Sequence, residues 1–443
     1  MKKFKSLFIG LAGVSAVALP LVAVSCNGGQ AKYIEKDKRI TKDVIKVNDT
    51  LESKIKELKE VPTIAFITES GDILDQSFNQ SGWEAVLDLI DQFKAADKKL
   101  VAKPIEPVTG SKLTDQYSAL LAAGTQIWIL SGYAHGDELP AFINANSEQL
   151  IKNNVKIIGL DYNIQPDQIT VPFKDLYTVS YKVQAPAYVV GQAVSDYLVK
   201  YSGTNKTTTT FGGGNYDGVT AFMNGYVKGI YSYDKANADA KVQVKTSGPD
   251  NKLEINSGFA ADPKMDSAIT AALQTNSKVI LPVAGTATAN LVTKLSQSNG
   301  NNSVIIGVDA DQSKAFPGKE GLFITSITKN LGQTVYDALL FTIFGINNPT
   351  NVFDAKATKV QALVGDLSNN WVGYAPSTLS NEDERNYVNQ KLNDYKTAFL
   401  SANEETKNFV YTNSTLPGQA GVDTVTGVAV ADAVVAEINK IVQ

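Results

Sequence analysis

Residues 63–93 read TIAFITESGDILDQSFNQSGWEAVLDLIDQF, and they predict one buried strand followed by one helix. The run over residues 63–68 is short, apolar and rich in β-branched and aromatic side chains, which is typical of a fully buried strand. After a polar turn, apolar residues recur at helical spacing at Trp83, Val86, Leu87, Leu89, Ile90 and Phe93. A buried strand that leads into such a helix is the repeating unit of a parallel sheet with helices on its faces.

The same alternation of strand and helix continues to about residue 344. Further strands are predicted at 102–107, 127–131, 155–161, 176–182, 207–211, 240–246, 278–283, 304–309 and 322–328. Helices are predicted between them at 115–123, 138–153, 185–201, 219–231, 266–274, 289–295 and 332–344. These strands are too numerous for one sheet of ordinary size. We therefore predict an α/β fold with two doubly wound parallel-sheet lobes joined by a hinge.

The N-terminus carries the pattern of an export signal. Three lysines within the first five residues precede an apolar run over residues 7–24, and the single cysteine of the chain, Cys26, follows it. A basic start, an apolar core and small residues before a cleavage point are typical of a secretory signal, and the placement of Cys26 looks like that of a lipoprotein. We predict a signal peptide over residues 1–26, with Cys26 lipidated, for example by palmitate, and a flexible tether over residues 27–58. An uncut anchor or a plain secretory signal is the alternative.

The composition argues against several classes of function. The net charge of −4 differs from the basic footprint of a nucleic-acid binder. The single histidine, His135, stands in a predicted loop, where we expect a solvated side chain rather than a catalyst. The sequence has no Cys/His cluster with zinc-ligand spacing, and the glycine run at 212–214 lacks the Lys-Ser/Thr of a P-loop. We therefore predict no catalytic residue, no metal and no cofactor.

Candidate binding residues follow the strands, because ligands of open α/β sheets bind outside the carboxyl ends of the strands. Polar, aromatic or glycine residues stand at those positions repeatedly: Glu69, Ser70, Asp72, Gly132, Tyr133, Asp161, Gly212, Asn215, Gly285, Thr286, Asp309 and Lys329. Aromatic faces suit a flat ring, and carboxylates accept hydrogen bonds from vicinal hydroxyl groups. These side chains favour a receptor for a small, neutral, polar ligand such as a nucleoside or a sugar.

Several segments resemble the basic membrane protein (BMP) family of lipid-anchored substrate-binding proteins of ABC transporters, several of which bind nucleosides. The most specific match is residues 64–80, which contain the run Asp75-Gln76-Ser77-Phe78-Asn79. Looser matches lie at 131–133 and 219–226, and a paired Asp309 and Lys329 signature lies within 306–330. The resemblance implies a fold like that of type I periplasmic binding proteins.

The resemblance also implies roles for individual residues. Phe78 and Phe222 would stack on the two faces of a base, and Asp309 and Lys329 would hold the ribose hydroxyl groups. Asp161 would form a hydrogen bond near the base. Together, the strand ends and the resemblance give nine candidate ligand-binding residues: Ser70, Asp75, Phe78, Asn79, Asp161, Phe222, Gly285, Asp309 and Lys329.

The remaining candidates have supporting roles. Ser70 would contribute near the base, and Asn79 and Asp75 would shape the turn and cap the helix that follows it. The chain departs from the family pattern at Glu69, where Asp is frequent, and at Tyr133, where Phe is usual. These departures leave the ligand open between a purine nucleoside, a pyrimidine nucleoside and a sugar.

We therefore expect a monomeric, lipid-anchored protein on the extracytoplasmic face of the cell membrane that delivers a nucleoside, expected to be a purine nucleoside, to an ABC permease. The first lobe is predicted at 60–171 plus 324–345 and the second at 172–323, with segments of 346–443 returning to both. Binding would proceed by closure of the lobes around the hinge. The alternatives are a sugar-binding lipoprotein, an enzyme similar to a nucleoside hydrolase, or a surface adhesin without a small ligand.

Overall fold

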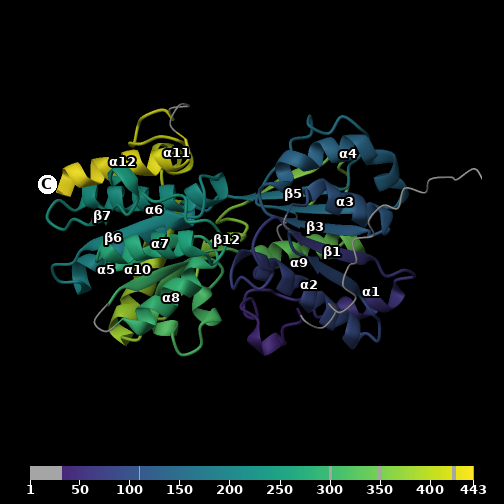
Figure 1. Cartoon of the computed structure of the whole chain (residues 1–443), viewed down its shortest axis with the longest axis horizontal. Helices are drawn as coiled ribbons and strands as arrows, with labels where there is room; N and C mark the ends of the chain where they lie inside the picture. The colour runs from purple at the N-terminus through teal and green to yellow at the C-terminus, as the bar shows by residue number, and fades with distance from the viewer. Residues whose placement is uncertain (1–31, 109, 299–301, 348–351, 422–425, 443) are drawn as a thin grey trace, which may run out of the picture.

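The computed structural model describes residues 32–108, 110–298, 302–347, 352–421 and 426–442. The chain forms two lobes that lie side by side and are joined by narrow connections (Figure 1). Each lobe has a six-stranded sheet with helices on both faces, so the predicted two-lobed α/β fold is confirmed. The predicted signal peptide, residues 1–26 with Cys26, lies outside the described residues.

The sheet of lobe 1 is entirely parallel and has the order β11-β5-β4-β3-β1-β2. Its strands are β1 (Thr63–Thr68), β2 (Val101–Ile105), β3 (Ile127–Ser131), β4 (Lys156–Leu160), β5 (Leu176–Tyr181) and β11 (Gln361–Gly365). Successive side chains of a strand point to opposite faces. Phe66 therefore packs with α2 (Phe78–Ala95) and α9 (Leu331–Phe344), whereas Ile67 packs with α3 (Leu113–Ala122) and α4 (His135–Lys152).

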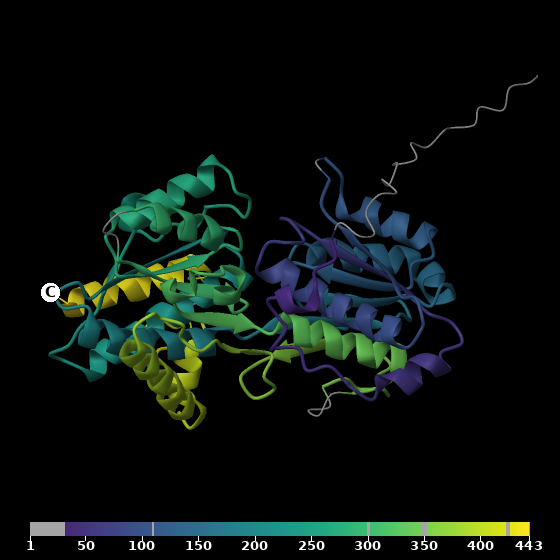
Figure 2. The same cartoon turned by 90° about the horizontal axis from the view of Figure 1, so that it is seen from below.

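The sheet of lobe 2 has the order β12-β10-β9-β8-β6-β7 and is parallel except for β12, which runs antiparallel to β10. Its strands are β6 (Thr207–Gly212), β7 (Gln243–Lys245), β8 (Val279–Val283), β9 (Val304–Asp309), β10 (Phe323–Lys329) and β12 (Val372–Tyr374). The helices of this lobe are α5 (Gln184–Tyr201), α6 (Asp217–Ala236), α7 (Pro263–Gln274), α8 (Ala287–Gln297), α10 (Glu382–Leu400), α11 (Glu404–Tyr411) and α12 (Val428–Val442). The three C-terminal helices lie against α5 and α6 (Figures 1 and 2).

The boundaries between the lobes differ from the predicted ones. The prediction began lobe 2 at residue 172 and returned to lobe 1 at 324, but β5 completes the sheet of lobe 1 and β10 belongs to the sheet of lobe 2. In the described part of the chain, the backbone crosses between lobes after β5, after β10 and between β11 and β12. The chain thus changes lobe after a strand ends, whereas the prediction placed each change before the strand. Buried parallel strands of the two lobes have the same apolar pattern, so the sequence does not say which sheet each one joins.

The predicted tether is also wrong for the described residues 32–58, which we call the N-terminal arm. The arm packs on lobe 1 through Leu51 and Ile55 of the short helix α1 (Leu51–Glu57), both of which are buried. The buried guanidinium of Arg39 pairs with Asp88 at 2.5 Å and with Asp91 at 2.7 Å, both on α2. Buried apolar residues are sparse in this charged segment, so its composition gave no sign of a docked arm.

Residues 352–421 and 426–442 supply β11 to lobe 1 and β12 to lobe 2, two short strands at sheet edges that the sequence pattern did not predict. Trp371, beside β12, is fully buried.

Over the residues described, no helix combines the length and the apolar character needed to cross a bilayer.

Candidate functional site

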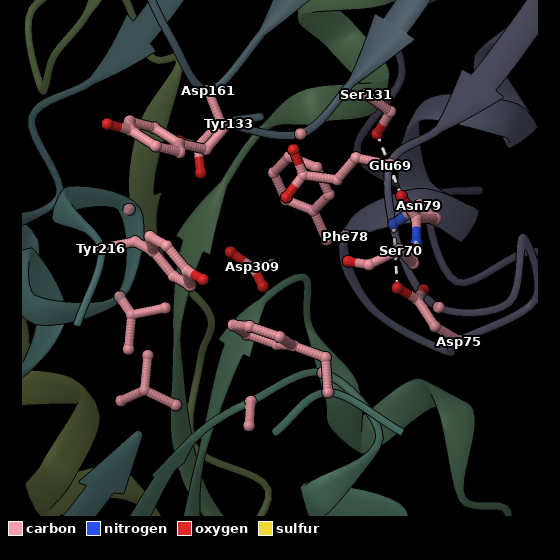
Figure 3. Close-up of a pocket in the computed structure, with 18 of the residues that line it drawn as sticks. Glu69, Ser70, Asp75, Phe78, Asn79, Ser131, Tyr133, Asp161, Tyr216 and Asp309 are labelled. Carbon is pink, nitrogen blue, oxygen red and sulfur yellow. Dashed lines mark hydrogen bonds between the residues drawn. The ribbon is translucent and has the colours of Figure 1, made fainter. Parts of the chain in front are cut away.

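A cavity of about 100 Å³ lies between the lobes, at the carboxyl ends of their strands. Lobe 1 lines it with residues that end or follow β1, β3 and β4, and lobe 2 lines it with residues that end or follow β6, β7, β8, β9 and β10. Figure 3 shows the side chains of both lobes directed into this common space. All nine candidate residues line the cavity: Ser70, Asp75, Phe78, Asn79, Asp161, Phe222, Gly285, Asp309 and Lys329.

A buried ion pair joins the two lobes inside the cavity. The Nζ atom of Lys329, at the end of β10, lies 2.9 Å from Oδ2 of Asp161, which follows β4 of the other lobe. The same Nζ atom lies 3.6 Å from Oδ1 of Asp309. Burial opposes the charge, but the two carboxylates raise the pKa of Lys329 above its usual value. Lys329 is therefore a buried ammonium group held between carboxylates of both lobes.

Two phenylalanine rings flank this ammonium group. The Nζ atom of Lys329 lies 5.3 Å from the ring centroid of Phe78 in lobe 1 and 5.1 Å from that of Phe222 in lobe 2. Both distances are within the range of a cation–π contact. The cavity therefore brings together aromatic faces, carboxylate acceptors and one cationic donor, the groups that recognise a flat ring carrying hydroxyl groups.

Both carboxylates of this set are on residues with an uncommon backbone conformation. Asp161 has φ 74° and Asp309 has φ 66°, which is the left-handed region. Such residues cost on the order of 1–3 kcal/mol each and cluster at functional sites. Gly218 gives Asp161 the room it needs, because a Cβ atom at Gly218 would lie 2.3 Å from Oδ2 of Asp161. Nothing in the sequence marks these conformations, apart from the tolerance of Asp for them.

Asp309 keeps one acceptor free. Among the described residues no donor forms a hydrogen bond with Oδ1 of Asp309, whereas its Oδ2 accepts one from Oγ of Ser77 at 3.3 Å. The ammonium group of Lys329 lies 3.6 Å from Oδ1, beyond hydrogen-bond length. Burial raises the pKa of Asp309, and the charge of Lys329 opposes that shift. A buried carboxylate oxygen in this state is an acceptor ready for a hydroxyl group of a ligand.

Asp75 and Asn79 hold the turn between β1 and α2. The Asp75 carboxylate accepts hydrogen bonds from three backbone amides at the start of α2, at 2.9–3.1 Å. Burial nevertheless raises the pKa of Asp75 to about 7. The Nδ2 atom of Asn79 donates to the backbone oxygen of Ser70 at 3.1 Å, and its Oδ1 accepts from Oγ of Ser131 at 3.0 Å (Figure 3). Both side chains thus fix the segment that presents Phe78 to the cavity.

The list of nine candidates omitted Glu69, which also lines the cavity. Its carboxylate accepts a hydrogen bond from the backbone N–H of Ala134, and it packs against Gly132, where a Cβ atom would lie 2.4 Å away. Burial raises the pKa of Glu69 to about 7, and the charge of Asp161 adds to that shift. Its position directly after β1 was the available signal.

Three aromatic residues at the edge of the cavity were likewise missing from the candidate list: Tyr133, Tyr216 and Phe259. The glycine run at 212–214 explains two of them. A Cβ atom at Gly213 or Gly214 would lie 2.4 Å from the ring of Phe259 or Tyr216, respectively. The glycines therefore make room for aromatic rings.

His135 differs from the expected solvated residue. Its side chain is fully buried at the start of α4, and its Nδ1 atom lies 2.6 Å from the hydroxyl group of Tyr117. Burial lowers the pKa of His135 to about 3, so the ring is neutral. His135 is not among the residues that line the cavity. The expectation was wrong because the loop that follows β3 is shorter than predicted, so that α4 begins at His135 itself.

Comparisons with known proteins point to one kind of protein. Residues 62–346 match the Bmp family model, which is described as "ABC transporter substrate-binding protein PnrA-like". The chain is 26% identical over 265 residues to basic membrane protein B of Borreliella afzelii, covering 59% of this chain and 68% of that protein. It is 24% identical over 284 residues to the ABC transporter nucleoside-binding protein BmpA of Lactococcus lactis, covering 62% of this chain and 72% of that protein. A solute-binding protein of an ABC transporter system from Aeropyrum pernix has a similar fold, with a TM-score of 0.57 and 17% identity over 86% of this chain and 98% of that one.

Proposed function

The chain belongs to the family of PnrA-like ABC transporter substrate-binding proteins, and we propose that it binds a nucleoside between its lobes and delivers it to a membrane permease. It is a solute-binding protein and not an enzyme, and it works outside the cytoplasm. The observation that carries the proposal is the arrangement around Lys329. Two phenylalanine rings, two carboxylates and one ammonium group line a single cavity.

In the proposed complex the base lies between Phe78 and Phe222, where stacking adds about 1 kcal/mol per ring pair beyond burial. The ribose hydroxyl groups donate to the free Oδ1 of Asp309 and accept from Lys329. Asp161 forms a hydrogen bond near the base. A relative whose printed name calls it nucleoside-binding, from Lactococcus lactis, supports this class of ligand, and we propose a purine nucleoside because its larger ring covers more of both phenylalanine faces.

Ligand entry requires the lobes to separate. The cavity of about 100 Å³ is smaller than the engineered cavity of about 150 Å³ that accepts benzene. A nucleoside is larger than benzene, so it can enter only if the lobes move apart at their three connections. Hinge closure around a ligand is a known motion of periplasmic binding proteins.

The charges of the cavity favour a nucleoside over a nucleotide. Four carboxyl groups line it, those of Glu69, Asp75, Asp161 and Asp309, against the one ammonium group of Lys329. Burial keeps a share of the protons on Glu69 and Asp75 near neutral pH, since it raises the pKa of each to about 7. The one ammonium group already contacts Asp161 and Asp309, so a phosphate would meet carboxyl groups without a free cation.

A ligand panel tests the proposal. We expect adenosine, guanosine or inosine to raise the unfolding temperature, because a ligand at 100 times its Kd stabilises the native state by about 2.7 kcal/mol. The matching 5′-monophosphates and free pentoses serve as controls and should leave it unchanged. Stabilisation by pentoses alone would favour a sugar receptor, and release of free base from the nucleoside would favour an enzyme.

We also propose that the protein is a monomer and that lipid on Cys26 holds it at the membrane. The lipid anchor is supported by the sequence pattern around Cys26 alone. In cells that express the full chain, a Cys26→Ser variant should move from the membrane fraction to the soluble fraction. Wild-type protein in the soluble fraction would contradict it.

A further inference from the structure

Two tyrosine rings meet across the cleft at its edge. Tyr133 follows β3 of lobe 1 and Tyr216 precedes α6 of lobe 2, and both line the cavity (Figure 3). Their ring centroids are 5.6 Å apart with an interplanar angle of 37°. Tyr133 is 38% exposed and Tyr216 is 48% exposed, so this pair lies at the solvent boundary rather than in the core.

The ring of Tyr216 is supported from within its own lobe. Phe259 lies behind it, with ring centroids 6.4 Å apart. The backbone oxygen of Phe259 accepts a hydrogen bond from Oγ1 of Thr286 at 2.8 Å, and the missing side chains of Gly213 and Gly214 leave space for both rings. Tyr216 is thus held in place before it meets Tyr133.

The tyrosine pair differs from the other contacts between the lobes in the cavity. The ion pair of Lys329 and Asp161 is buried among the groups assigned to the ligand, so a bound ligand competes with it. Neither tyrosine belongs to that ion pair, and both rings are exposed at the edge of the cavity, so a ligand that displaces the ion pair does not have to displace their contact. Both rings are exposed and meet across the cleft, so their contact is not part of the buried core of either lobe.

We propose that Tyr133 and Tyr216 form an aromatic gate, a pair of rings that closes over the cavity with the lobes and slows the departure of bound ligand. The identity of the ligand in this inference rests on the proposed function, whereas the contact between the two rings does not. An aromatic pair of this kind contributes enough to change an equilibrium or a rate by about 2- to 12-fold.

Dissociation kinetics test the gate with adenosine as the probe. Tyr133→Ala and Tyr216→Ala should each raise the dissociation rate constant by about 2- to 12-fold, and the double variant should dissociate no faster than the faster single variant. Tyr216→Phe keeps the ring and should behave as the wild type. Unchanged dissociation in both alanine variants, or independent multiplicative effects of the two, would overturn the gate.

A second measurement needs no ligand. A double-mutant cycle on urea unfolding of the ligand-free protein should give a coupling of at least about twofold in the unfolding constant between Tyr133 and Tyr216. The control pairs Tyr216 with Tyr33, which is similarly exposed at 39% on the N-terminal arm and should show no coupling. Absence of coupling between Tyr133 and Tyr216 would overturn the gate even if nucleosides bind. If no nucleoside binds, the proposed function fails and the cycle alone decides whether the ring pair links the lobes.

Discussion

An Arg39→Ala variant should lose about 3–5 kcal/mol of its free energy of unfolding, the usual cost of removing one partner of a buried ion pair. The side chain of Arg39 is fully buried, and it neutralises Asp88, whose side chain is 5% exposed, and Asp91. Without the guanidinium group, the carboxylate of Asp88 remains buried in lobe 1 without its partner. Urea unfolding monitored by circular dichroism measures the loss.

A neighbouring residue provides the control for this variant. Lys38 is exposed and lies next to Arg39 in the arm, so Lys38→Ala should change the free energy of unfolding by less than about 0.5 kcal/mol. Equal stability of the two variants would mean that the arm is the flexible tether predicted from composition. A large difference would establish the arm as part of lobe 1.

The docked arm also supports the candidate site indirectly. Glu84 on α2 accepts hydrogen bonds from the backbone N–H groups of Ile40 at 3.1 Å and Thr41 at 2.9 Å. Helix α2 begins at Phe78, so the arm forms hydrogen bonds with the helix whose first residues line the cavity. The N-terminal arm therefore helps to fix the orientation of Phe78, a candidate binding residue.

The sequence predicted the place of the candidate site well because that place follows from sheet geometry. A buried parallel strand can be recognised in the sequence as a short apolar run. The carboxyl ends of such strands lie at one edge of the sheet. That argument brings Asp309 and Lys329 together in one sheet, and the prediction that the two lobes face each other across one cleft adds Asp161 from the other sheet. The resemblance to the BMP family, confirmed by the family match, added Phe78 and Phe222.

Other features depend on interactions that a single sequence does not encode locally. Whether β5 joins lobe 1 or lobe 2 depends on which sheet edge is open, and its apolar pattern is the same in either case. The burial of Arg39 depends on two carboxylates 49 and 52 residues away. The contact of Tyr133 with Tyr216 requires the relative position of the lobes. In each case the missing information concerns long-range geometry rather than the type of residue.

An Asp309→Ala variant should lose roughly 10- to 150-fold in affinity for the nucleoside, as isothermal titration calorimetry would measure. One hydrogen bond from a ribose hydroxyl group to the free Oδ1 of the carboxylate contributes about 1.5–3 kcal/mol. The control is Asp311→Ala, because Asp311 also follows β9 but does not line the cavity, and its affinity should stay within about threefold of the wild type. Equal losses in the two variants would point to damage of the β9 terminus instead of a lost ligand contact.

The same variant separates binding from stability. Lys329 keeps its ion pair with Asp161 at 2.9 Å when Asp309 is removed, so no buried ammonium group is left alone. The substitution also removes a buried carboxylate oxygen without a hydrogen bond, and such an oxygen costs free energy in the ligand-free protein. Because alanine keeps the backbone strain but not the carboxylate, we expect unfolding of Asp309→Ala at the same or a higher urea concentration. A residue whose removal weakens binding and leaves stability intact is one that the fold retains for its ligand.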